Sequence, residues 1–176
     1  MNLLHEIAAG QNAPQIINVI IEIPKGSKNK YELDKETGLI TLDRALHTSQ
    51  DYPFDYGFVP QTHWADGDPL DVVVLTTYAL NSGVVVKVRP VAIIKMVDGG
   101  ESDAKIIGVP DHDPRWSDVE DLADINKHTV KEIEHFFLTY KKLENKEVRI
   151  DGIEGKEKAI EAIEKSICLY KEKFQK

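Results

Sequence analysis

The chain has 176 residues, a length typical of one domain, and we expect residues 1–176 to fold around a single core. Its 22 basic and 30 acidic side chains give a net charge of −8, which disfavours binding to nucleic acids and anionic lipid surfaces. Cys168 is the only cysteine, which excludes an intrachain disulfide, and no apolar run approaches the ~20 residues that span a bilayer. We therefore expect a cytoplasmic globular protein.

The first part of the chain carries the alternating apolar pattern of β-strands. Ile17, Val19, Ile21 and Ile23 fall on one face of a predicted strand, which ends at Pro24. Gly, Asn, Asp and Ser residues separate the apolar segments that follow, as is typical of strands joined by tight turns. These further predicted strands cover approximately residues 30–34, 39–44, 70–77, 84–97 and 105–109.

Helical spacing replaces this alternation after about residue 110. Val130, Ile133, Phe137 and Tyr140 lie three or four positions apart, and another apolar stripe predicts a long C-terminal helix that begins after Gly155. This second stripe consists of Ile160, Ile163, Ile167, Tyr170 and Phe174. Strands followed by helices predict an α+β domain, in which helices flank a closed or nearly closed antiparallel β-barrel.

Acidic residues gather in two turn segments. Asp66, Asp68 and Asp71 lie within six residues, interrupted by Gly and Pro, while Asp98 and Asp103 stand at the base of a predicted hairpin. Each segment alone is also compatible with a solvated acidic turn, since Asp, Gly and Pro are common turn formers. Oxygen ligands without nearby Cys or paired His favour Mg²⁺ or Mn²⁺ over zinc.

Basic residues accompany these carboxylates along the chain. Lys30 alternates with Glu32, Lys105 alternates with Asp103, and Arg44 ends a predicted strand. Taken singly, each basic residue also fits an ordinary exposed position, whereas their combination predicts an anion-binding site. The same two interpretations, a packing role or a site role, apply to the neighbouring aromatic residues Tyr52, Tyr56 and Tyr140, the last of which precedes Lys141.

Several motifs occur in a fixed order around Asp66-Gly67-Asp68-Pro69-Leu70-Asp71. They are Ile21-Glu22-Ile23-Pro24-Lys25-Gly26-Ser27, Asn29-Lys30-Tyr31-Glu32, Leu42-Asp43-Arg44, Tyr52-Pro53, Asp55-Tyr56-Gly57, and Phe136-Phe137 followed by Tyr140-Lys141. In these motifs the sequence resembles the family I soluble inorganic pyrophosphatases, from about Val19 to the final helix. The resemblance implies a five-stranded barrel of oligonucleotide-binding-like (OB-like) topology, an active site at its mouth and a homohexamer.

The resemblance also implies that the chain hydrolyses pyrophosphate to two orthophosphates with a metal-activated water in a multi-Mg²⁺ carboxylate site. Asp68 would act as the general base. Asp66, Asp71 and Asp103 would bind the first metal ion, and Asp71 would also reach the second. Asp98 would join Asp103 at a substrate-bound ion, with Glu22 and Glu32 holding further ions. The residues implied to contact or surround the substrate are Lys30, Glu32, Arg44, Tyr52, Tyr56, Lys105, Tyr140 and Lys141.

One position departs from the pattern of many bacterial relatives, because Gly99 follows Asp98 where they have Glu. A water or Glu101 would then have to take the place of the missing Glu.

Two other functions are compatible with parts of the pattern. A nucleic-acid-binding barrel would share the fold but conflicts with the charge of −8. A metal-dependent hydrolase acting on nucleotides would share the acidic pocket.

Overall fold

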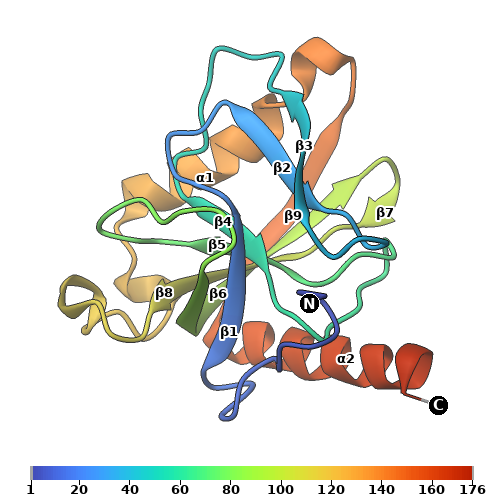
Figure 1. Ribbon diagram of the computed structural model, residues 1–176. Helices are drawn as coiled ribbons and strands as arrows, with labels where there is room; N and C mark the ends of the chain where they lie inside the picture. Colours follow the sequence, from blue (N-terminus) through green and yellow to red (C-terminus); the bar gives the residue numbers. More distant parts are fainter. Residues whose placement is uncertain (1, 176) are drawn as a thin grey trace.

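A computed structural model describes residues 2–175 (Figure 1). Five strands form a closed ring of pairings in the order β1, β4, β5, β8 and β6, because β1 pairs with both β4 and β6. Strands β7 and β9 pair with β6, while β2 and β3 form a separate sheet. The bounds are β1 Ile17–Ile23, β2 Asn29–Leu33, β3 Ile40–Ala45, β4 Asp55–Phe58, β5 Asp71–Val74, β6 Val85–Asp98, β7 Glu101–Ser102, β8 Lys105–Pro110 and β9 Val148–Gly155.

One pairing in this ring is parallel, so the expectation of an antiparallel barrel is wrong there. β5 and β8 run in the same direction, with Asp71 opposite Lys105 and Val74 opposite Gly108. The physical reason is the long strand β6, which lies between them in sequence and pairs antiparallel with β8. The chain reverses direction between β5 and β6 and again between β6 and β8, so β5 and β8 run the same way and their first residues lie side by side. This mixed sheet places Asp71 beside Lys105.

Both faces of β1 are buried, which explains its nearly continuous apolar sequence. Ile17, Val19 and Ile21 pack in one core cluster, whereas Ile20 packs with Phe58 in another. A strand covered on both faces does not need polar residues at alternate positions. Its second face therefore carries Ile20, which is fully buried.

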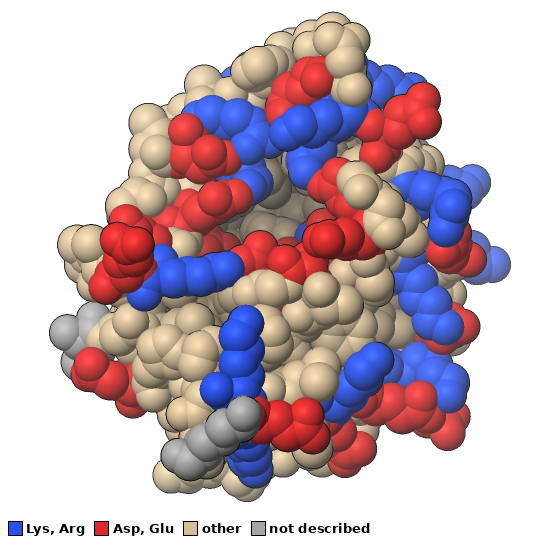
Figure 2. All heavy atoms as spheres, turned by 90° about the vertical axis from the view of Figure 1, so that its right-hand side faces the viewer, with Lys and Arg blue, Asp and Glu red and all other residues tan. Residues whose placement is uncertain are grey.

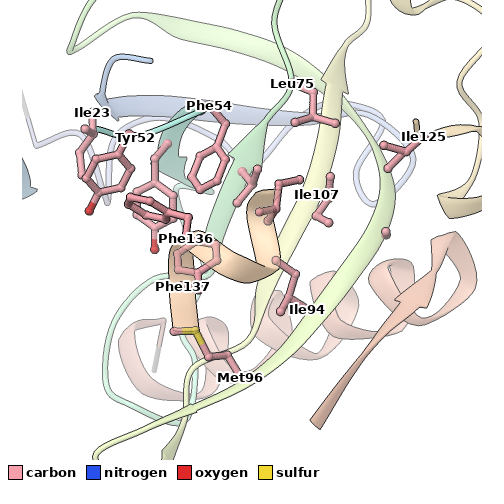
Figure 3. Packing of buried hydrophobic residues seen from close by; sticks show 14 of the residues in the cluster. Ile23, Tyr52, Phe54, Leu75, Ile94, Met96, Ile107, Ile125, Phe136 and Phe137 are labelled. Carbon is pink, nitrogen blue, oxygen red and sulfur yellow. The ribbon is translucent and has the colours of Figure 1, made fainter. Parts of the chain in front are cut away.

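Helix α1 (Lys127–Thr139) closes an aromatic cluster beside the ring. The amide groups of His128 and Thr129 donate to the Asn126 side chain, which caps the start of the helix. Phe136 lies 4.8 Å from Tyr52 between ring centroids, within the distance range of favourable aromatic pairs. Figure 3 shows Phe136 and Phe137 directed toward Tyr52 and Phe54. The packing fixes the end of α1, where Tyr140 and Lys141 follow.

Helix α2 (Lys156–Phe174) confirms the predicted helix after Gly155 and packs mainly against β6. Figure 1 shows α2 below the ring and α1 on its upper side. The buried face of α2 differs from the predicted stripe, because Phe174 is 45% exposed while small residues face the sheet. The buried residues are Ala159, Ala162, Ile163, Ser166 and Tyr170. Small side chains allow the helix to approach closely.

Three short 3-10 helices, η1 (Pro114–Trp116), η2 (Leu122–Asp124) and η3 (Lys142–Glu144), lie in the connections around α1. The predicted combination of a five-stranded ring with two helices, one of them C-terminal, is thus confirmed. Within residues 2–175, neither α-helix has both the length and the apolar character that crossing a bilayer requires.

Candidate active site

A cavity of about 330 Å³ opens between the β2–β3 hairpin, residues 66–71, the β6–β7 hairpin and the end of α1. Figure 2 shows a hollow surrounded by interleaved acidic and basic side chains. The lining has eight carboxyl side chains and four lysines, an excess of four acids. The lining residues are Glu22, Lys30, Tyr31, Glu32, Leu33, Lys35, Tyr56, Asp66, Asp68, Pro69, Asp71, Asp98, Glu101, Asp103, Lys105, Tyr140 and Lys141.

Lys105 is the centre of the cavity's hydrogen-bond network. Its ammonium lies 2.8 Å from the carboxylates of Asp71 and Asp103 and donates to the Tyr56 hydroxyl at the same distance. Burial lowers the pKa of Lys105, but the charges of Asp71 and Asp103 outweigh burial and hold this pKa above its ordinary value. A permanently charged ammonium therefore holds the carboxylate of Asp71, at the start of β5, close to that of Asp103, in the connection between β7 and β8.

Tyr56 completes this network from β4. Its hydroxyl donates to Asp71 Oδ2 at 2.5 Å, while burial and the charge of Asp71 raise the pKa of Tyr56 well above its ordinary value. The phenol thus stays protonated and remains a hydrogen-bond donor. Tyr140 at the end of α1 behaves similarly, because burial and the charge of Asp98 raise its pKa as well. Two neutral phenols therefore border the charged cavity.

The loop from Asp66 to Asp71 is shaped by its backbone. Gly67 has a φ of +89°, a left-handed conformation that glycine adopts without strain. The amide of Trp64 donates to the Asp68 carbonyl at 2.8 Å, and the amide of Asp68 donates to Asp66 Oδ1 at 3.0 Å. These bonds turn the loop so that its three carboxylates all line the cavity.

The carboxyl groups of Asp66 and Glu22, which both line the cavity, have raised pKa values. Burial raises the pKa of Asp66 to about 6, with smaller contributions from Asp103 and Asp71, although the Asp68 amide opposes the rise. Burial raises the pKa of Glu22 to about 8, and the charge of Asp71 adds to this shift. The Leu33 amide donates to Glu22 Oε1 at 2.7 Å, which ties β1 to β2. In the metal-free molecule Glu22 is mostly protonated at neutral pH.

Two further lysines pair with cavity carboxylates. Lys30 forms an ion pair with Glu32 and a longer one with Asp43, at 3.6 Å. Burial lowers the pKa of Lys30 despite the opposing charge of Asp43. Lys141, just after α1, pairs with Asp98 at the end of β6. Each of these ammonium groups reaches the cavity from a different structural element.

Twelve of the fourteen residues predicted for the site line this cavity; Arg44 and Tyr52 do not. Arg44 lies opposite Lys30 in the β2–β3 pairing, but its guanidinium donates to Glu144 Oε1 at 3.1 and 3.2 Å. Tyr52 is 2% exposed and packs within the aromatic cluster behind the cavity, where burial raises its pKa well above the ordinary value. The structure thus places these two side chains beside the cavity rather than in its wall.

Lys35 lines the cavity but was missed from the sequence. Its ammonium pairs with Asp68 and donates to the Gly67 carbonyl at 3.2 Å, across the mouth of the cavity. The turn that carries Lys35 is held by Asp34, whose side chain accepts from the amides of Glu36 and Thr37. The sequence around Asp34 indicates a turn, but it does not indicate that this turn faces Gly67 and Asp68 across the cavity. Tyr31, Leu33 and Pro69 also line the cavity and were not predicted, and Glu101, which was considered as a replacement for the Glu missing at position 99, lines it too.

The donor set fits hard divalent cations. The charged and polar side chains that line the cavity end in carboxyl, hydroxyl or ammonium groups, and no His or Cys is among the lining residues. Within residues 2–175, no three acidic, His or Cys side chains already converge as a metal cluster. Lysine ammonium groups stand between the carboxylates instead, and four acids remain in excess. This excess of negative charge favours cation binding.

A model of the inorganic pyrophosphatase family matches residues 19–171. The chain belongs to this family. It is 49% identical to the inorganic pyrophosphatase of Haloferax volcanii over 175 residues, covering 99% of both chains. It is also 46% identical to soluble inorganic pyrophosphatase 1 of Arabidopsis thaliana, covering 96% of this chain and 79% of that protein.

A solved structure extends this similarity to the whole fold. The inorganic pyrophosphatase of Thermus thermophilus superposes with a TM-score of 0.94 at 44% identity, covering 97% of this chain and 99% of the other. The expected family is therefore confirmed, and with it an enzyme of the hydrolase class.

Proposed function

We propose that this protein hydrolyses inorganic pyrophosphate to two orthophosphates in the cavity around Lys105, with Mg²⁺ held by the cavity carboxylates. The observation that carries this proposal is the interleaving of eight carboxyl groups with four lysines in one cavity of a member of this family. Carboxylates suit divalent ions, whereas ammonium groups suit phosphate oxygens. A cavity with both sets matches a metal-bound polyanion.

The metal ligands in this proposal are the cavity carboxylates themselves. Asp66, Asp71 and Asp103 would hold the first ion, and Asp71 would also reach a second. Asp98 would join Asp103 at the substrate-bound ion, while Glu22 and Glu32 would hold further ions. Divalent ions bound there would neutralise the charge of pyrophosphate and lower the pKa of a coordinated water. Mn²⁺ is a reasonable substitute because it accepts the same oxygen ligands.

The remaining side chains act on the substrate and on protons. Asp68, 54% exposed at the cavity mouth, accepts the proton of the attacking water at its carboxylate. The donors hold phosphate oxygens and stabilise the charge of the departing phosphate. These donors are Lys30, Arg44, Tyr56, Lys105, Tyr140 and Lys141. Tyr52 supports Tyr56 from the aromatic cluster, with ring centroids 5.8 Å apart.

The test is orthophosphate release from pyrophosphate in Mg²⁺, compared with release from ATP at the same concentration. Pyrophosphate should be strongly preferred, and a preference for ATP would contradict the assigned substrate. Asp68→Asn should retain metal binding and lose most turnover. If its turnover equalled that of the parent, another base would have to act.

A second variant tests the metal ligands. Asp71→Ala should raise the Mg²⁺ concentration needed for half-maximal activity, because one carboxylate serves two ions in the proposed site. An unchanged Mg²⁺ dependence would contradict that role.

The proposed quaternary structure is a homohexamer of single-domain subunits in the cytoplasm, and the molar mass in solution, measured by light scattering, tests it. The OB-like topology of the ring also remains part of the proposal.

A further inference from the structure

A second cavity, of about 460 Å³, opens between α2 and the segment from β6 to β8. Its volume lies within the range of small-molecule sites. Met96, Ile93, Ala104 and Ala162 form an apolar lining, and each is less than 10% exposed. Trp64 contributes an indole ring. The cavity can therefore accept a flat apolar group.

The charges at the rim favour an anion, because the two lining acids, Asp151 and Glu161, are already paired with Arg149 and Lys158. Lys95 pairs with Glu154 at 2.8 Å and Lys158 pairs with Glu161 at 2.8 Å, so these ammonium groups are already neutralised. In the described part of the chain Lys165 forms no ion pair, and its ammonium lies 5.1 Å from the centroid of the Trp64 ring. A cation over an indole face is placed to bind the acidic group of a molecule stacked on that ring.

The second cavity and the active-site cavity share their backbone. Ala104 lines the second cavity, while its neighbours Asp103 and Lys105 line the active-site cavity. At the end of β6, Val97 likewise lines the second cavity and its neighbour Asp98 lines the active-site cavity. The Trp64 amide also donates to the Asp68 carbonyl at 2.8 Å. A molecule that shifts Trp64 as it stacks on the indole ring would therefore also shift the loop that carries Asp68.

We propose that the second cavity binds small aromatic anions, such as aryl carboxylates, sulfonates or phosphates, between Trp64 and Lys165. Occupancy lowers the turnover number of the enzyme without raising KM, because the ligand shifts the Asp68 loop and does not occupy the substrate site. Binding at the cavity is independent of the proposed catalytic function. The effect on turnover rests on that function.

The binding test uses the fluorescent probe 8-anilinonaphthalene-1-sulfonate on the folded protein, in EDTA. Lys165→Ala and Trp64→Leu should each weaken probe binding about tenfold, the loss expected for a charge-assisted contact or a stacked ring. Lys171→Ala removes an exposed lysine of α2 outside the cavity and should bind like the parent. Equal affinity of the Lys165 and Lys171 variants would overturn the proposed site.

Two further measurements distinguish this site from the active-site cavity and from a subunit contact. In excess Mg²⁺, orthophosphate, the product of the proposed reaction, should not displace the probe, since displacement would place the probe in the active-site cavity. Light scattering should give the same molar mass for the parent and Lys165→Ala, because a lower mass for the variant would make this face a contact with a second copy.

In Mg²⁺ the probe should lower the turnover of the parent, and about tenfold more probe should be needed to lower the turnover of Lys165→Ala equally. Probe binding without any change in turnover would retain the site and refute its coupling.

Discussion

Replacing Lys105 with methionine should destabilise the metal-free protein by about 3 kcal/mol. At 2.8 Å and an effective dielectric near 20, each contact with Asp71 or Asp103 contributes about 6 kcal/mol of attraction, most of it offset by the burial of the ammonium. Removing one member of a buried charged group costs about 3–5 kcal/mol, because the others stay buried without a partner. The two carboxylates are 21% and 16% exposed, so solvent reduces the cost toward the lower limit.

Urea denaturation in EDTA measures this difference, and thermal unfolding should show a fall of about 6–12 °C for a chain of this length. Lys95→Met is the matched control, because Lys95 pairs with Glu154 on the surface, where both side chains are more than a third exposed. The control should lose less than about 1 kcal/mol.

Excess Mg²⁺ should reduce the deficit of Lys105→Met, since a divalent ion between Asp71 and Asp103 can replace the missing positive charge. Equal urea midpoints for Lys105→Met and the parent in EDTA would refute the reasoning. That result would mean that the two carboxylates do not need the ammonium to stay together.

Three further predictions follow from single contacts. The folded pKa of Glu22 is about 8 against an ordinary 4.5, so the folded state holds the extra proton between these values and its stability should fall as pH rises from about 5 to 8. In EDTA, Glu22→Gln should remove on the order of 3 kcal/mol of this pH dependence, measured as urea midpoints across the window; an unchanged slope would contradict the raised pKa. Lys35→Ala should raise KM for pyrophosphate about fivefold with a smaller change in kcat, whereas Lys35→Arg should behave like the parent and Lys28→Ala serves as control. Equal KM values for both alanine variants would remove Lys35 from the site. Gly57→Ala should destabilise the fold by about 3 kcal/mol in calorimetry, because its Cβ would lie 1.9 Å from the Ile20 carbonyl oxygen, and a melting temperature equal to that of the parent would contradict this packing.

The local elements could be predicted from the sequence because each depends on its own residues. The alternation from Ile17 to Ile23 and the start of α2 after Gly155 both correspond to observed elements. The direction of β8 relative to β5 could not be predicted in this way. It depends on how the long strand β6 pairs with its neighbours, and alternation along a strand contains no information about which strand lies beside it.

The helix stripe shows a second limit of sequence patterns. Large apolar residues such as Ile160 and Phe174 were expected to face the core, yet Ala159, Ala162 and Ser166 are buried and Phe174 is 45% exposed. Hydrophobicity predicts which side chains gain from burial, but a closely packed helix also requires small side chains at the contact. The spacing alone did not distinguish these two requirements.

The membership of the site was largely predictable, whereas its internal contacts were not. Asp66, Asp71 and Asp103 come together in one cavity as expected, although their metal-binding role remains a prediction. The sequence did not reveal that Lys105 would lie between Asp71 and Asp103, since that depends on the parallel register of β5 and β8. Lys35 was missed because its partner Asp68 lies 33 positions away in the sequence, and local patterns do not show that the two segments meet.

The ion pairs within the cavity also explain how an acidic protein can hold an acidic substrate. In the proposed roles, lysines that bind phosphate are paired with carboxylates that bind metal, as Lys105 is with Asp71 and Lys141 with Asp98. Binding of a metal–pyrophosphate complex then exchanges partners: the carboxylates turn to the cations and the lysines turn to phosphate oxygens. Few charges lose a partner in this exchange, so its electrostatic cost is small. Pyrophosphate without metal would take the lysines and leave the carboxylates unpaired, and for this reason it should bind the metal-free protein only weakly.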